Sequence, residues 1–191
     1  MTATEAVSAI ATGRLSAETY VCTLLARASS LANLHAFITL NPGAIASARA
    51  VDAARAAGQK LPPLAGLPIV VKDNINTKDL PTTGGTPRLQ SFQPDNDAVV
   101  LQRLLAAGAV VLGKTNMHEL AFGTTTTNFA SFAGFCRNPD DTARMVGELV
   151  GRYRSCDCSA DVPGWSWHRY RRIRANSRGV ERNRWTPPFR R

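Results

Sequence analysis

The sequence predicts an α/β fold in which helices pack against a sheet. Two short apolar runs, at residues 67–72 and Val110–Leu112, are typical of buried strands, because they are rich in β-branched residues and flanked by proline, glycine or polar turn residues. Between them, Ala98–Ala107 carries apolar residues at helical spacing, and Gly108 then closes the helix. The order strand, helix, strand indicates a layered arrangement with at least one right-handed crossover. At 191 residues, the chain is long enough for one domain with a substantial core.

Local signals also predict the elements on either side of these strands. The N-cap residues and the glycines that end helices set most of the boundaries. Before the first buried strand, the expected elements are a helix at Thr4–Ala11 that stops at Gly13, a helix that begins after Ser16, a strand at Ala36–Leu40 and a helix at Ala44–Ala57 that ends near Gly58. After the second buried strand, Asn116–Phe122 predicts another short helix.

Lys72 stands where the first buried strand meets polar turn residues. An ammonium at such a strand end loses hydration, which disfavours its charged form and can leave a neutral amine able to accept a proton. Lys72 is therefore a candidate general base. The alternative interpretation is that its long side chain reaches water and only caps the strand end.

Two polar groups further along the chain have both a functional and a structural interpretation. Thr124–Thr127 supply four successive hydroxyls, which can bond to the backbone of a turn or to a substrate amide. His118 and Glu119 could serve a metal ion or acid/base chemistry. A single helical histidine is more often structural, so we expect these two residues to pack or to lie on the surface.

Positive charge is concentrated in the last quarter of the sequence. The net charge is +9, and residues 144–191 hold 12 arginines against 4 acidic residues, whereas all 4 lysines lie earlier. All 3 tryptophans also lie in this tail. An arginine-rich arm with interleaved aromatic side chains could bind nucleic-acid phosphates and bases. Nucleic-acid binding is therefore one functional hypothesis.

Apolar runs and cysteines give further expectations. No run is long enough to cross a bilayer or to form a secretory signal, which predicts a cytoplasmic protein with no membrane partner. Cys22 falls in a helical pattern and Cys136 in a loop. Cys156 and Cys158 have C-x-C spacing without a second pair, so the sequence supports neither a disulfide framework nor a zinc site.

Several motifs in order resemble one enzyme family. They are GLPIVVKDNINT, TTGGTP, VVLQRLLAAGAVVLGKTNMHELAFG and TNFASFAGFCRNPDDTAR, and they are similar to the N-terminal third of the amidase signature family of serine amidohydrolases. The resemblance runs from about Met1 to Arg144. It implies the N-terminal portion of the amidase signature fold, a mixed sheet flanked by helices, and Ser-cisSer-Lys chemistry that needs no cofactor or metal.

The resemblance also implies site residues and a substrate class. In the family a lysine, a serine in a cis peptide bond and a nucleophilic serine hydrolyse amides, and the lysine corresponds to Lys72. The loop near the substrate corresponds to Gly123, Thr124, Thr125, Thr126, Thr127 and Asn128. HELAFG and TNFASFAG look most similar to members that act on small arylacetamides, such as indoleacetamide or mandelamide hydrolases. A small-molecule amide substrate and a homodimer of the intact relative are expected, and specific nucleic-acid binding is not.

Both family serines are missing from this sequence. Family members continue with a GGSSGG turn that carries the cis serine and, further on, a GTDTGGS-like turn that carries the nucleophile. Here residues 145–180 are MVGELVGRYRSCDCSADVPGWSWHRYRRIRANSRGV. Lys72 is thus the one member of the catalytic set that the resemblance finds in this chain.

A shifted reading frame accounts for both absences. If the DNA from Glu148 onward is read one base later, the genetic code permits SSSGGTAAAIAARM, and from Pro163 onward it permits PAGLGTDTGGSVRIPA. At one position the shifted codon, made of the last two bases for Val162 and the first base for Pro163, cannot encode the valine that we expected there. The codon of the nucleophile would span Ile173 and Arg174. GC-rich DNA read out of frame also yields many CGN codons, which explains a tail rich in arginine and free of lysine.

The sequence therefore predicts two unlike parts. Residues 1–144 are expected to be the N-terminal part of an amidase domain, and residues 145–191 an arginine-rich, frameshifted tail that lacks sustained apolar periodicity and is disordered. We expect the chain as written to be an inactive fragment, because Lys72 has no serine to act on.

Overall fold

The computed structural model describes residues 1–123 and 132–145. Its helices are α1 (Ala3–Ala11), α2 (Ala17–Ser30), α3 (Ala44–Ala56) and α4 (Val99–Ala106), with 3-10 helices η1 (Ala32–Leu34), η2 (Pro87–Leu89) and η3 (Glu119–Ala121). Its strands are β1 (Phe37–Leu40), β2 (Pro68–Lys72), β3 (Val110–Thr115), β4 (Arg137–Asn138) and β5 (Asp141–Met145). The predicted Thr124–Asn128 loop and nearly all of the predicted tail lie outside the described residues.

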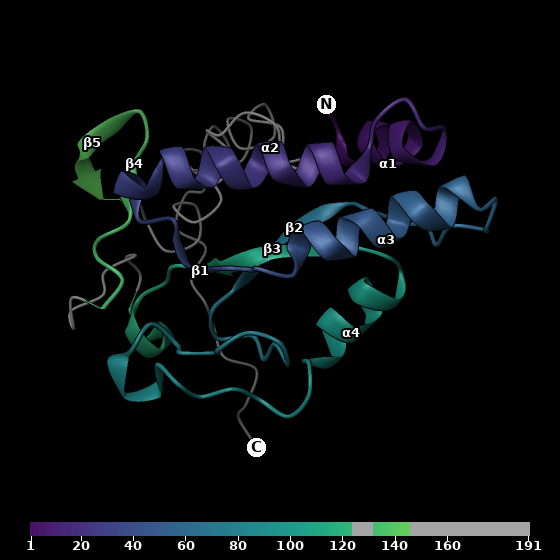
Figure 1. Cartoon of the computed structure of the whole chain (residues 1–191). Coiled ribbons are helices and arrows are strands. Elements are labelled where there is room, and N and C mark those ends of the chain that lie inside the picture. Colours follow the sequence, from purple (N-terminus) through teal and green to yellow (C-terminus); the bar gives the residue numbers. More distant parts are fainter. Residues whose placement is uncertain (124–131, 146–191) are drawn as a thin grey trace, which may run out of the picture.

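The central sheet is mixed, as predicted. Its strand order is β1-β3-β2, with β3 antiparallel to β1 and parallel to β2. The chain passes from β2 through α4 to β3, which confirms the predicted succession of strand, helix and strand (Figure 1). β3 runs to Thr115, three residues beyond the predicted end of the strand. The register shifts once in each of its two pairings, between Phe37 and Thr39 of β1 and between Ile69 and Val70 of β2.

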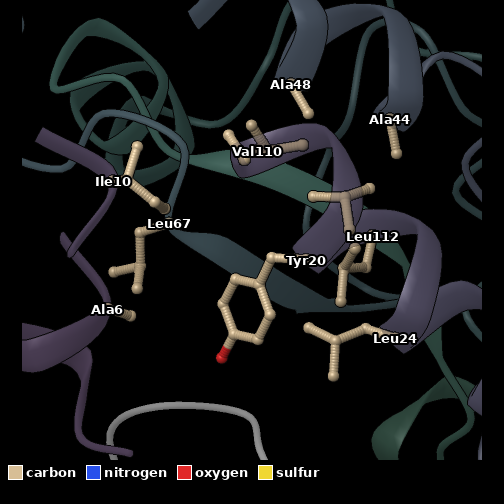
Figure 2. Close-up of a cluster of buried hydrophobic side chains, with 11 residues drawn as sticks. Ala6, Ile10, Tyr20, Leu24, Ala44, Ala48, Leu67, Val110 and Leu112 are labelled. Atoms are coloured by element: carbon tan, nitrogen blue, oxygen red, sulfur yellow. The ribbon is translucent and has the colours of Figure 1, made fainter. Parts of the chain in front are cut away.

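Helices cover both faces of this sheet (Figure 1). On one face, buried side chains of α1, α2 and α3 form a cluster with Leu67, Val110 and Leu112. Figure 2 shows Leu112 between Ala44 and Leu24 in this cluster. On the other face, a smaller cluster joins four buried residues, Val71, Leu80, Leu101 and Val111. The described core is therefore organised in layers, with the sheet in the middle.

The helix boundaries follow from the capping signals in the sequence. Thr2 forms a capping box with Glu5 at the start of α1, and the Ser16 hydroxyl accepts a hydrogen bond from the Thr19 amide at the start of α2. Asp52 of α3 strengthens the second cap, since its carboxylate accepts hydrogen bonds from the Ser16 hydroxyl and from backbone amides of the first turn of α2. These contacts confirm Ser16 as a helix start and fix α2 against α3.

Gly113 is required by the close approach of β1. A Cβ atom at this position would lie 2.4 Å from the Thr39 carbonyl oxygen and 3.0 Å from the Leu40 Cα atom. Both contacts involve backbone, which cannot rotate away as a side chain can. A glycine is therefore the residue that lets β3 pair on both sides at its centre.

The predicted helix at Asn116–Phe122 is wrong. The structure has only η3 there, and Leu120 and Ala121 have φ values of 51° and 57°, which belong to the left-handed region. The Asn116 side chain explains the break, because its amide donates to the His35 and Gly134 carbonyls and its oxygen accepts from the next backbone amide. These bonds hold the chain against η1 and β4 instead of letting a helix begin.

No helix in the described ranges is long and apolar enough to span a bilayer.

Cys22 lies on α2 and Cys136 in the segment before β4, as the pattern predicts, and both are free thiols.

Candidate functional site

Lys72 is the last residue of β2 and is half-buried. Its Cα pairs with that of Thr115, the last residue of β3, so both parallel strands end at the same edge of the sheet. The Ile75 amide donates to the Lys72 carbonyl at 2.9 Å and turns the chain immediately after the strand. In α/β proteins the carboxyl ends of parallel strands are the usual place for ligands and chemistry. The structure therefore supports the position that the sequence predicted for Lys72.

Asp73, the next residue, is completely buried. Its Oδ2 atom accepts hydrogen bonds from the Thr83 amide at 3.1 Å, from the Thr83 hydroxyl and from the Gly85 amide at 3.2 Å. The Asp73 carbonyl accepts from the Gly84 amide at 3.3 Å. One acidic residue thus binds both its side chain and its backbone to the turn at residues 83–85.

Lys114, in β3, is the largest fully buried side chain of the described chain. Its Nζ atom donates to the Ile75 carbonyl at 2.7 Å, to the Thr77 hydroxyl at 3.0 Å and to the Thr82 hydroxyl at 2.9 Å. The same atom lies 3.8 Å from Oδ1 of Asp73. Three hydrogen bonds and one ion pair therefore compensate an ammonium that has lost its hydration.

Burial changes the protonation equilibria of this pair. Loss of hydration lowers the pKa of Lys114 from 10.5 to about 8, against the opposing effect of Asp73. Loss of hydration also raises the pKa of Asp73, although hydrogen bonds from Thr83 and the charge of Lys114 favour its ionised form. Each charge also favours the ionised form of the other, so the two protonation equilibria depend on each other.

Three segments meet around this pair, two from the loop after β2 and one from the chain after β3. Lys114 joins the turn at residues 75–77 to Thr82, and Asp73 joins the same strand end to residues 83–85. The Leu120 amide donates to the Gly84 carbonyl at 2.7 Å and brings in the segment after β3. The edge of the sheet at which Lys72 ends is therefore held rigidly by buried hydrogen bonds.

The remaining predicted site residues are only partly visible. Gly123 lies beside the His118 ring, since a Cβ atom there would be 2.4 Å from the ring Nε2. Thr124, Thr125, Thr126, Thr127 and Asn128 lie outside the described residues. His118 is buried, and its Nδ1 lies 3.1 Å from the Glu119 carbonyl oxygen. Within residues 1–123 and 132–145, no group of three His, Cys, Asp or Glu side chains is placed to hold a metal ion.

Sequence reasoning missed Asp73 and Lys114 as parts of the site. Asp73 lies inside GLPIVVKDNINT and Lys114 inside VVLQRLLAAGAVVLGKTNMHELAFG, but neither motif predicted a role for them. A signal was present, because a lysine in the middle of an apolar run is seldom buried unless it has partners. The sequence could not identify the partners, which are far apart along the chain.

Comparison with known proteins gives the family. The model of the amidase family matches residues 19–148. This chain belongs to the amidase signature family. The fold agrees, since a solved peptide amidase from Stenotrophomonas maltophilia superposes with a TM-score of 0.69 at 35% identity, over 75% of this chain and 31% of its own.

Other relatives of this amidase chain are known by sequence and structure. A glutamyl-tRNA(Gln) amidotransferase subunit from Thermobifida fusca is 42% identical over 165 residues, which cover 85% of this chain and 33% of the relative. A solved vestigial protein complex that reveals the origins of an s-triazine catabolic enzyme contains a chain with 41% identity and a TM-score of 0.74, over 80% of this chain and 34% of that one. The chain spans about a third of the length of the relatives it matches.

The pKa shifts of the buried pair predict that the stability of this amidase chain depends on pH. Because the folded state lowers the pKa of Lys114 from 10.5 to about 8, the unfolded state binds more protons between these values. The free energy of unfolding should therefore rise with pH through this window, by up to about 3 kcal/mol. The raised pKa of Asp73 has the opposite sign, so its contribution falls as pH rises above 3.8.

Urea unfolding between pH 7.5 and 10.5 checks the Lys114 contribution. Tyrosines and thiols titrate in the same range. The quantity to follow is therefore the difference in the free energy of unfolding between the wild type and Lys114→Met. We expect the two free energies to diverge as pH rises. Parallel curves would contradict the assignment.

Proposed function

We propose that the whole protein hydrolyses a carboxylic acid amide to the acid and ammonia, with Lys72 as its proton acceptor. The observation that carries the proposal is the position of Lys72. It ends a half-buried strand at the edge where the two parallel strands stop, in a chain of the amidase signature family.

The chemistry follows from a neutral amine at this position. Lys72 would take a proton by way of the bridging serine, and the second serine would attack the amide carbonyl. Backbone N–H groups of a glycine-rich turn would stabilise the negative oxygen of the tetrahedral intermediate. The C–N bond then breaks and the nitrogen leaves as ammonia with the returned proton. Water finally attacks the acyl-serine ester, which releases the acid and restores the serine.

The sequence motifs and the names of the relatives suggest different substrates. HELAFG and TNFASFAG, at residues 118–123 and 127–134, favour a small arylacetamide such as indoleacetamide or mandelamide. The curated relatives are instead named for an amidotransferase that acts with glutamyl-tRNA(Gln). We propose the arylacetamide class, and a panel of indoleacetamide, mandelamide and glutamine separates the two. Faster release of ammonia from glutamine would contradict the proposal.

We also propose that residues from about 145 onward are a frameshifted translation of an amidase gene. Two facts support this proposal. The match of the family model ends at residue 148, where the shifted frame begins to give the missing serine turns, although the alignment with the relative from Thermobifida fusca covers 85% of this chain and so runs past that residue. The relatives are about three times as long as the matched part of this chain. The arginines of the tail then result from the codons and have no binding role.

Frame repair tests both proposals at once. Removing one base just upstream of codon 148 should open a reading frame that runs past residue 191 and contains GTDTGGS. The longer product should release ammonia from an amide of the panel, whereas the 191-residue chain should show no turnover above background. A stop codon before GTDTGGS would contradict the frameshift. Turnover by the 191-residue chain that Lys72→Ala abolishes would contradict the need for the missing serines.

The names of the relatives bear on partners and on the alternative function. They describe a protein complex and one component of a multi-chain enzyme. We therefore propose assembly with a different chain in place of the predicted homodimer, to be checked by the mass of the longer product in solution, alone and with co-purified proteins.

If the arginine arm instead binds nucleic acid, the 191-residue chain should bind a defined RNA or DNA at roughly physiological salt.

A further inference from the structure

Lys72 and Asp73 are adjacent in the sequence, but their charges act against each other in the proposed function. A carboxylate close to an amine stabilises the ammonium form and makes the amine a poorer proton acceptor. Asp73 is completely buried, so its charge is screened much less than a charge at the surface. A lysine that works as a base beside such a carboxylate needs a second cation to neutralise it.

Lys114 supplies that cation. Its Nζ atom lies 3.8 Å from Oδ1 of Asp73, and both side chains are 0% exposed. Oδ1 accepts no hydrogen bond from the described residues, whereas Oδ2 has three donors at residues 83–85. The Lys114 ammonium therefore offsets part of the Asp73 charge, beside the hydrogen bonds from Thr83 and Gly85. A second carboxylate, Asp97, also raises the pKa of Lys114, but less than Asp73 does. The Oδ1 atom of Asp97 accepts a hydrogen bond from the Lys78 amide at 2.7 Å.

Strand geometry separates this pair from Lys72. The register pairs Lys114 with Val71 and pairs Lys72 with Thr115. Successive side chains of a strand point to opposite faces of the sheet. Lys72 therefore leaves β2 on the face opposite to Val71, and Lys114 draws the Asp73 carboxylate toward the face of Val71.

We propose that Lys114 is a positioning residue for the reaction, because it neutralises Asp73 and holds the carboxylate away from Lys72, so that Lys72 stays able to accept a proton. The proposal rests on the proposed function of Lys72 as the base. It predicts that the charge of Lys114 matters because of Asp73, and that Lys114 becomes dispensable for Lys72 once the Asp73 carboxylate is removed.

The test measures the protonation of Lys72 directly. The 191-residue chain is treated with limiting acetic anhydride, which acetylates neutral amines, between pH 5.5 and 11, and mass spectrometry gives the extent of labelling at each lysine. Exposed Lys60 serves as the internal reference in the same sample. Wild type is compared with Lys114→Met, Asp73→Asn and the double variant, and circular dichroism checks the fold of each.

We expect Lys114→Met to raise the pH midpoint of Lys72 labelling by about one unit, because the Asp73 charge is then unbalanced below about pH 8, where Lys114 of the wild type is still protonated. In the double variant the midpoint should return to the wild-type value or lower. Asp73→Asn alone should not raise it. A merely structural role of Lys114 would not produce this pattern, since both variants that lack Lys114 would then change the midpoint alike.

Three results would overturn the proposal: an unchanged midpoint in folded Lys114→Met, a midpoint that stays raised in the double variant, or a raised midpoint in Asp73→Asn. If Lys114→Met does not fold, a raised midpoint in Asp73→Asn or in the double variant still overturns the proposal. The failure of the proposed function is distinct, because labelling needs no turnover. A wild-type Lys72 that labels like Lys60 would count against Lys72 as a base whatever Lys114 does.

Discussion

In the longer, frame-repaired product, Lys72→Ala should lower kcat by about 10³-fold, within the range that general acid–base catalysis contributes. The alanine removes the amine that accepts the proton and leaves β2, its pairing with β3 and the buried pair at Asp73 unchanged. Because proton transfer occurs in the transition state, kcat and kcat/KM should fall together. Steady-state release of ammonia from the best amide of the panel measures the effect.

Lys78→Ala is the matched control for this variant. Lys78 is an exposed lysine in the loop that follows β2. Its backbone, and not its side chain, makes the hydrogen bonds with Asp97 and Gln93. Its replacement should leave kcat within about twofold, as is usual for surface positions away from a site. Equal losses in the two variants, or a Lys72→Ala enzyme with nearly full kcat, would refute the role of Lys72.

The second large effect concerns stability, where Lys114→Met should destabilise the 191-residue chain by about 3–5 kcal/mol. The variant leaves the Asp73 carboxylate buried without a counterion, and it removes the donor from the Ile75 carbonyl and the Thr77 and Thr82 hydroxyls. Methionine has a similar length, so loss of packing volume contributes little. Urea unfolding at pH 7 measures the difference.

A double-variant cycle identifies the cause of this loss. Asp73→Asn combined with Lys114→Met should cost less than the sum of the single variants, by about 1–3 kcal/mol, because the double variant leaves no unpaired charge. Additive losses would show that the two residues do not depend on each other. A loss below about 1 kcal/mol for Lys114→Met would show that the lysine is not compensated as described.

The sequence was sufficient for features that depend on neighbouring residues. The cap at Ser16, the helix stop at Gly108 and the strand that ends on Lys72 were all predicted, and the structure confirms each of them. In each case the determining interaction spans a few residues, or follows from the periodicity of apolar side chains. The place of Lys72 at a strand end could therefore be deduced before the fold was known.

Features that depend on distant residues were not predictable in the same way. Asn116–Phe122 has the pattern of a helix, but Asn116 bonds to His35 and Gly134, and these contacts exist only once β1, β3 and β4 are in place. The gain from satisfying the buried Asn116 amide outweighs the small helix preference of this short segment. Local preference was overridden by tertiary hydrogen bonding.

The charges around Lys72 also depend on residues that are distant in the sequence. The sequence alone determined which residues could end strands, cap helices and carry an amine at the sheet edge. Only the tertiary structure decided that Lys114 would lie 3.8 Å from Asp73, and that both would be shielded from water. The reason is physical: the energy of an ion pair depends on the distance and the surrounding dielectric, and both are set by how residues 73–85 fold over β3.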